Sequence, residues 1–263
     1  MMTITGHELR LNTKTILVWA ATVGLCIFVF MLLYPPFKSQ SADIDKMFAG
    51  MGQFSVAFGM DKISIATPIG FYGIQDGVML SLGGAMFAAM IGIGMLSKEE
   101  GNHTAEFLFT SSESRGSILI QKWLAAAAAI LIFDVFCLAC GVLSFYAIGE
   151  ELLWKELLLF HLAQLIMHLE IGSICFGISA FLKKNNAGLG IGIASLLYFL
   201  NMFINFSEKL DGLKYITPFH YSDAVNIFSS VRIEIPEIAA GILIGAVVCI
   251  VGSNYFVRRD LSA

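Results

Sequence analysis

Six long apolar stretches dominate the sequence, and charged or turn-forming residues separate each stretch from the next. They cover about residues 15–34, 71–97, 118–148, 153–182, 187–206 and 237–257. A helix needs roughly 20 mainly apolar residues to cross the hydrocarbon core of a bilayer. Each stretch reaches that length, so the pattern predicts an all-α membrane protein in which a single domain contains six transmembrane helices.

Composition supports a membrane protein and excludes one class of partner. Of the 263 residues, 57% are hydrophobic and only 14% are charged, whereas soluble domains carry about 25% charged residues. The net charge of −4 argues against nucleic acid, whose binding needs clustered Lys and Arg. The first apolar run is long for a signal peptide, and Tyr34-Pro35-Pro36 follows it instead of a small-residue cleavage site. We therefore predict an uncleaved first span.

Basic residues indicate the orientation of the spans. Lys183-Lys184 lies in a tight turn between two spans, and Arg258-Arg259 follows the last span. Such residues mark cytoplasmic segments. We therefore expect a multi-pass protein of the cell membrane with both termini in the cytoplasm. The outer segment 207–236 contains LKYITPFHYSDAVNIF, which is too apolar for a solvated loop, and it predicts short re-entrant helices before the last span.

The segment between the second and third spans, EEGNHTAEFLFTSSESRGSILIQKW at residues 99–123, is polar. Asn102 and Thr104 are residue types that begin helices, Phe107-Leu108-Phe109 forms an apolar edge, and the serines after it end the helix. These features predict a short amphipathic helix at about 99–114. It either lies on lipid headgroups or docks in a groove of a cytoplasmic partner. Arg115 and Lys122 are expected at the membrane surface.

This segment resembles the one between the second and third spans of type-2 ABC exporter permeases. That family reads E-x-x-x-x-T-x-E-x-L-L, then S-R, I-L and a Lys. The matching residues are Glu99, Thr104, Glu106, Leu108, Ser114, Arg115, Ile118, Leu119 and Lys122. Phe109 stands where Leu is usual, and Asn102-His103 replaces a common Gly. The sequences LKYITPFHYSD and YFVRRDL resemble the family's segment before the last span and its usual ending.

The resemblance implies that residues 99–114 are a coupling helix that presses into a separate ATPase subunit. The residues it implicates in this contact are Glu99, Glu100, Thr104, Glu106, Phe107, Leu108, Phe109 and Arg115. The sequence has no Gly-Lys dipeptide, so it lacks the phosphate loop of ATPases. ATP and Mg are therefore expected on the partner, and no cofactor is expected in this chain.

The resemblance also implies an assembly of two ATPase subunits with a second permease, identical or homologous. In the family, the first and fifth spans form the interface between permeases. Gly188, Gly190 and Gly192 in the fifth span suit such a close contact. Packing within one chain is the alternative interpretation of these glycines.

Ionisable and amide side chains lie inside the predicted spans. The third span holds Asp134, and the fourth carries His161, Gln164 and His168 on one stripe, with Glu170 roughly opposite. Counting residues from the surface predicts that Asp134 contacts one of the histidines. Such groups are candidates for a transport pathway or a proton-coupled element, or else for hydrogen bonds that fix helix packing. No H-E-x-x-H zinc motif is present.

Asn201 and Asn205 lie toward the outer end of the fifth span. They either line the path between two subunits or cap the end of the helix. The residues alone leave both interpretations open.

Together these features predict a permease subunit of an ATP-driven exporter. The chain itself is not an enzyme, and its substrate is amphiphilic, such as a peptide, a drug or a lipid-like compound, because no large outer domain is present. The alternatives are an intramembrane enzyme and a proton-coupled secondary transporter, both using Asp134, His161, His168 and Glu170. Neither alternative needs a cytoplasmic docking helix between the second and third spans.

Overall fold

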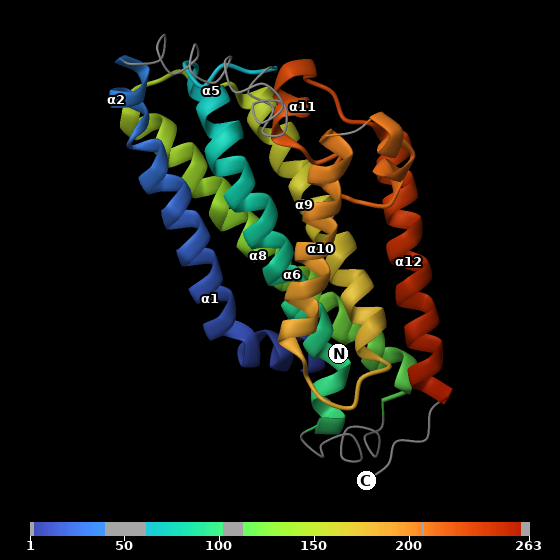
Figure 1. Ribbon diagram of the computed structural model, residues 1–263. Helices are drawn as coiled ribbons and strands as arrows, with labels where there is room; N and C mark the ends of the chain where they lie inside the picture. The colour runs from blue at the N-terminus through green and yellow to red at the C-terminus, as the bar shows by residue number, and fades with distance from the viewer. Residues whose placement is uncertain (1–2, 40–61, 102–112, 207, 259–263) are drawn as a thin grey trace.

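The computed structural model describes residues 3–39, 62–101, 113–206 and 208–258, and within these ranges all regular structure is helical (Figure 1). Six helices or helical stretches are long and apolar enough to cross a membrane, so the predicted six-span fold is confirmed. The helices that supply them are α1 (Thr3–Met31), α6 (Gly77–Gly101), α8 (Arg115–Ile148), α9 (Trp154–Ser179), α10 (Ala187–Phe206) and α12 (Ile235–Arg258).

The first helix begins well before the predicted span, because α1 includes the polar residues from Thr3 onward. Its first turns, dark blue in Figure 1, lie across the lower end of the bundle, while the rest rises along the bundle. Asn12 and Thr13 donate side-chain hydrogen bonds to the carbonyls of Glu8 and Leu9, four residues earlier (2.8 and 2.9 Å). Bonds of this kind often bend helices, and they lie where the polar turns meet the apolar span.

The second span also begins earlier than predicted. Thr67 caps the short helix α5 (Pro68–Phe71) by accepting from the Gly70 amide, and a π-helical turn, η1 (Tyr72–Asp76), joins α5 directly to α6. A π-helical turn inside a helix is rare and is frequently found at functional sites.

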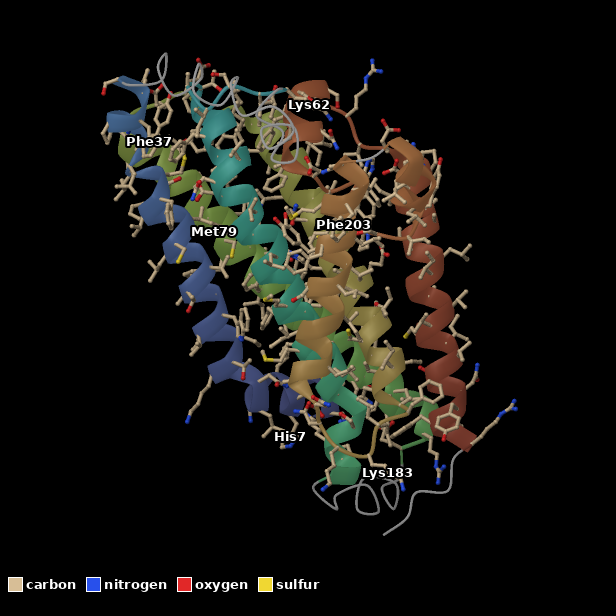
Figure 2. All side chains as sticks on the ribbon, in the orientation of Figure 1. His7, Phe37, Lys62, Met79, Lys183 and Phe203 are labelled. Carbon is tan, nitrogen blue, oxygen red and sulfur yellow. The ribbon has the colours of Figure 1, made fainter. Side chains whose placement is uncertain are left out.

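Helix α6 lies at the centre of the bundle, where it packs against α1, α8, α9 and α10. Buried aromatic rings fill the contact, as in the stacked pair of Phe87 and Phe133, whose centroids are 4.8 Å apart. Large apolar side chains also cover the outside of the bundle, and Phe203 is 61% exposed. Polar and charged side chains mark the two ends, with Lys62 at one and His7 and Lys183 at the other (Figure 2). This distribution is that of a bundle whose middle faces hydrocarbon.

Helices α1 and α12 begin and end, respectively, at one end of the bundle, which we call the terminal end (Figure 1). The opposite end carries α2 (Tyr34–Ser39), the 3₁₀ helix η2 (Glu208–Tyr215) and α11 (Ala224–Ser230). The segment before the last span thus contains the short helices that its apolar sequence predicts, and Phe219, Tyr221 and Phe228 are buried against the bundle. Re-entry of these helices into the bilayer stays a prediction.

Helices α9 and α12 approach closely near the terminal end because two glycines face each other. A Cβ atom on Gly252 would lie 2.1 Å from the carbonyl oxygen of Gly177, and one on Gly177 would lie 2.3 Å from the carbonyl oxygen of Val248. Small residues allow this backbone approach between membrane helices.

We predict that Gly252→Ala destabilises the bundle by about 1–3 kcal/mol, the usual cost of overpacking, because the new methyl group meets backbone that cannot rotate away. The measurement is the thermal midpoint of the purified chain in detergent. Gly116→Ala is the matched control, since a Cβ there has no neighbour within 4 Å among the described residues. Equal midpoints for the two variants would contradict the close contact.

Candidate functional site

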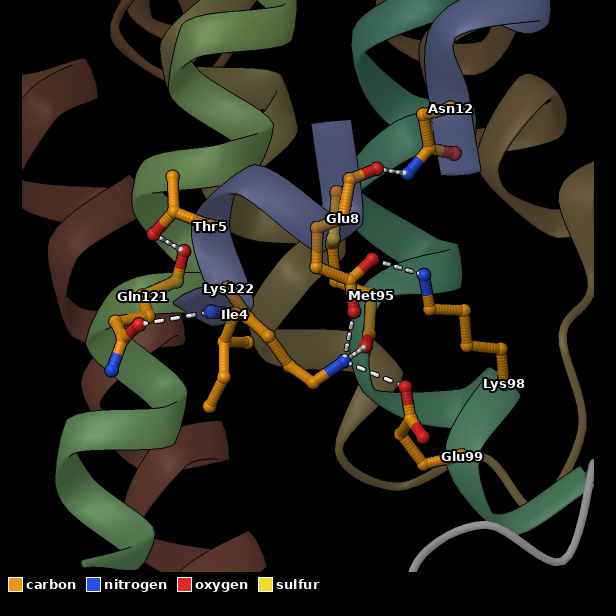
Figure 3. A network of polar contacts seen from close by, with 9 residues as sticks. All are labelled: Ile4, Thr5, Glu8, Asn12, Met95, Lys98, Glu99, Gln121 and Lys122. Atoms are coloured by element: carbon orange, nitrogen blue, oxygen red, sulfur yellow. Dashed lines mark hydrogen bonds and ion pairs between the residues drawn. The ribbon is translucent and has the colours of Figure 1, made fainter. Parts of the chain in front are cut away.

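A buried ionic network joins three helices at the terminal end (Figure 3). The Lys122 ammonium of α8 donates to Glu8 of α1, to Glu99 of α6 at 2.7 Å and to the Met95 carbonyl at 3.2 Å. Lys98 of α6 also pairs with Glu8. An ammonium group has three donors, and these three acceptors satisfy all of them. We call Glu8, Lys98, Glu99 and Lys122 the charge network.

The structure adds to the sequence prediction for Lys122, which concerned its depth at the membrane surface and stays a prediction. Its side chain is 1% exposed, because the first turns of α1 cover it. Those turns are fixed to α8 by hydrogen bonds to Gln121, whose carbonyl accepts from the Thr5 hydroxyl at 3.0 Å and whose side chain accepts from the Ile4 amide at 3.3 Å. Sequence reasoning missed Glu8, since one acidic residue in a polar terminal segment carries no sign of its distant partners.

The charge network flanks the coupling segment, residues 99–114. Glu99, predicted to contact an ATPase, bonds Lys122 inside the chain, and Glu100 belongs to the last turn of α6. Arg115 begins α8, and its Nη1 donates to the Val257 carbonyl of α12 at 2.8 Å. The remaining predicted coupling residues lie outside the described part of the chain; they are Thr104, Glu106, Phe107, Leu108 and Phe109.

Inside the bundle, Asp134 and His168 form the contact that residue depth predicted. Asp134 Oδ1 lies 2.9 Å from His168 Nδ1, which joins α8 to α9. Helix α6 leaves room for the imidazole ring, because a Cβ on Gly84 would lie 2.2 Å from it. The three helices meet around one buried polar pair.

The other two residues of the α9 stripe bond to different segments instead of to each other. His161 Nε2 lies 2.9 Å from the Tyr72 hydroxyl of η1. Gln164 donates to the Ser222 carbonyl at 2.8 Å, in the segment between η2 and α11. The stripe therefore connects α9 to three elements and does not form a single continuous chain of hydrogen bonds among the described residues.

Glu170 faces away from this stripe, toward α12. Its carboxylate accepts from the Tyr221 hydroxyl at 2.8 Å, and the glutamate is 4% exposed. Burial raises the pKa of the Tyr221 phenol, and the nearby Glu170 charge raises it further, so the phenol stays a neutral donor. Sequence reasoning missed Tyr221 because it lies in a loop far along the chain.

Sequence reasoning also missed a second buried acid in addition to Glu8, namely Asp76. It lies in η1 with 0% exposure, and neither carboxylate oxygen has a hydrogen-bond partner among the described residues. The sequence could have identified Asp76 as a candidate, because it is an acidic residue inside an apolar run, as Asp134 is. Such a group needs water, a proton or a ligand to compensate it.

Asn201 and Asn205 line a small cavity of about 60 Å³ between α6, α10 and the start of α11, together with Ser81 and Asp223. Helix α10 continues to Phe206, so Asn201 does not cap the helix end. Its Oδ1 is buried without a partner among the described residues. The two amides thus form part of a polar cavity wall.

The three glycines of α10 have different surroundings. Gly190 packs inside the chain, because a Cβ there would lie 2.8 Å from the Ala89 carbonyl oxygen of α6. The within-chain interpretation therefore holds for Gly190, whereas Gly188 and Gly192 are exposed.

A protein-family model described as ABC-2 family transporter protein matches residues 2–260. The chain belongs to the ABC-2 transporter family. A search of curated proteins found no match. As an ABC-2 permease, the chain is the membrane subunit of an ABC transporter and not its catalytic part. ABC-2 permeases generally work with an ATPase subunit.

For this ABC-2 permease we predict that Lys122→Met lowers the free energy of unfolding by about 3–5 kcal/mol, because it leaves the buried Glu8 and the partly buried Glu99 without this cation. The measurement is denaturant or thermal unfolding in detergent. Lys155→Met, at an exposed position in α9, is the control. Adding Glu99→Gln to Lys122→Met should recover part of the loss. If Lys122→Met matched Lys155→Met, the network would not contribute to stability.

Proposed function

We propose that this ABC-2 permease is the membrane subunit of an exporter driven by ATP hydrolysis on a separate subunit. In this proposal both termini are cytoplasmic, the coupling segment docks on the ATPase, and two ATPase copies work with two permeases. ATP and Mg are bound by the ATPase. The observation that carries the proposal is the charge network, which joins both helices flanking the coupling segment to α1.

The network gives the coupling segment a mechanical role. Movement of residues 99–114 by the ATPase would act on the last turn of α6 and the first turn of α8. Because Lys122 is bonded to α1 and α6 at once, these helices would move together as a rigid body, a common form of switching transition. A docking segment attached to only one helix would bend that helix without rotating the bundle.

Two features support a second permease and a path between subunits. Helix α10 exposes the large apolar side chains of Leu196, Phe199 and Phe203. Gly188 and Gly192 are exposed on the same helix. The cavity lined by Asn201 and Asn205 lies beside this helix. In the proposed assembly, α10 faces the second permease and the two amides form part of the polar wall met by an amphiphilic substrate.

We predict that an ATPase subunit co-purifies with this chain from native membranes, and that changing Phe107 and Leu108 to Asp abolishes the association, because two charges would enter an apolar docking groove. The measurement is affinity purification in mild detergent followed by identification of nucleotide-binding subunits.

The matched control changes Phe199 and Phe203 of α10 to Asp, which should leave the ATPase bound and weaken the permease pair. If transport followed a proton gradient and no ATPase were bound, the result would contradict the exporter proposal and would support a proton-coupled transporter.

We predict that Asp134→Asn lowers ATP-driven transport several-fold while assembly stays intact. The amide keeps the size of the side chain and can still accept from His168, but it removes the charge. The measurement is substrate export from vesicles, with co-purification of the ATPase as the assembly control. Unchanged transport would assign Asp134 and His168 to packing alone.

A further inference from the structure

A long apolar groove runs along the membrane-embedded side of the bundle between α9 and α12, with Trp123 of α8 at its base. Its upper part has a volume of about 390 Å³, and its wall includes Trp123, Leu169, Ala246 and Ile250. A second hollow of about 370 Å³ continues toward the terminal end and shares Trp123 and Cys249 with the first. We call both hollows together the side groove.

One wall of the side groove carries a carboxylate. Glu170 lines the upper hollow, and its Oε2 accepts from Tyr221 while Oε1 has no hydrogen-bond partner among the described residues. A buried carboxylate oxygen in apolar surroundings is costly unless a hydrogen-bond donor compensates it. The groove therefore combines hydrocarbon walls with one acceptor that lacks a donor.

One glycine of α12 makes room for this carboxylate, and a second lies beside the Cγ atom and backbone of Glu170. A Cβ on Gly241 would lie 2.2 Å from Glu170 Oε2, whereas one on Gly245 would meet the Glu170 side chain at 3.4 Å, an ordinary contact distance. Gly245 also lines the groove beside Glu170.

The charges of the wall select the kind of ligand. Among the described residues that line the side groove, Glu170 is the ionisable acid, and none is Lys, Arg or His. A phospholipid would bring a phosphate close to this carboxylate with no cation to compensate it. A single-chain amphiphile with an ammonium head group supplies both the missing donor and the opposite charge.

We propose that the side groove binds cationic single-chain amphiphiles, with the ammonium group on Glu170 and the alkyl chain along Trp123 and Cys249. This proposal rests on the proposed export function, since it names the substrate class. Tyr221 lies between the groove and a polar cavity of about 490 Å³ at the opposite end of the bundle, whose wall includes Tyr221 and Glu237.

The test is a binding titration on the purified chain in phosphatidylcholine nanodiscs, with Trp19→Phe and Trp154→Phe so that Trp123 is the only tryptophan. The probes are 11-bromoundecylamine, 11-bromoundecanol and 11-bromoundecanoate, because bromine quenches tryptophan fluorescence on contact. We expect saturable quenching by the amine at a concentration about tenfold lower than for the alcohol, as a charge-assisted hydrogen bond would give. The carboxylate should bind most weakly.

Variants separate the carboxylate from the apolar wall. Glu170→Gln should remove the preference for the amine. Gly245→Ala should weaken amine binding, because its methyl group would narrow the groove beside the Glu170 Cγ atom, 3.4 Å away, at a distance that the packing tolerates. Glu151→Gln at an exposed position and Gly6→Ala, where a Cβ has no neighbour within 4 Å among the described residues, should leave binding unchanged.

Equal binding of the amine and the alcohol, or an unchanged preference in both Glu170→Gln and Gly245→Ala, would overturn the proposal and leave the groove as a surface that any hydrocarbon chain covers. No ATPase is needed in this assay. Its failure would therefore leave the exporter function untouched, and failure of ATPase co-purification would leave the groove's ligand preference standing.

Discussion

The Lys122 ammonium, buried among the acceptors of two other helices, is the interaction on which the terminal end of the bundle depends. A buried cation is tolerated only when its donors and charge are compensated, so Glu8, Glu99 and the Met95 carbonyl have to come together around it. This requirement folds the first turns of α1 across the bundle and fixes the separation of α6 and α8. The network therefore links α1 to the end of α6 and the beginning of α8, the two helices on either side of residues 102–112.

The same constraint explains the polar contacts deeper in the membrane. Hydrocarbon offers no hydrogen bonds, so buried polar groups are stabilised by partners inside the protein, and two of these pairs link separate elements. Asp134 with His168, and Glu170 with Tyr221, join elements that are distant in the sequence. Asp76 and Asn201 keep polar atoms without partners among the described residues. Asn201 lines the cavity beside α10, where water or a substrate can compensate it, whereas Asp76 lies in η1 and is not part of the cavity wall.

Small residues decide where the helices touch and where they leave space. Gly177 and Gly252 bring the backbones of α9 and α12 together near the terminal end. Farther from the terminal end, Gly241 and Gly245 of α12 instead accommodate the Glu170 side chain. The side groove lies next to Gly245. One helix pair thus contains both a close contact and a groove, and its glycines serve different purposes in each.

The sequence by itself determined the six spans, the family resemblance and the contact of Asp134 with a histidine, because apolar run length and residue depth are local properties of the chain. It also marked Glu170 as an unusual intramembrane acid. Only the tertiary structure decided that Lys122 is buried with Glu8, that Gly190 packs against α6, and that Tyr221 bonds Glu170. Each of these depends on which helix faces turn toward each other, and the apolar pattern does not specify this, because in a bilayer hydrophobic residues cover the outside of the bundle as well as its core.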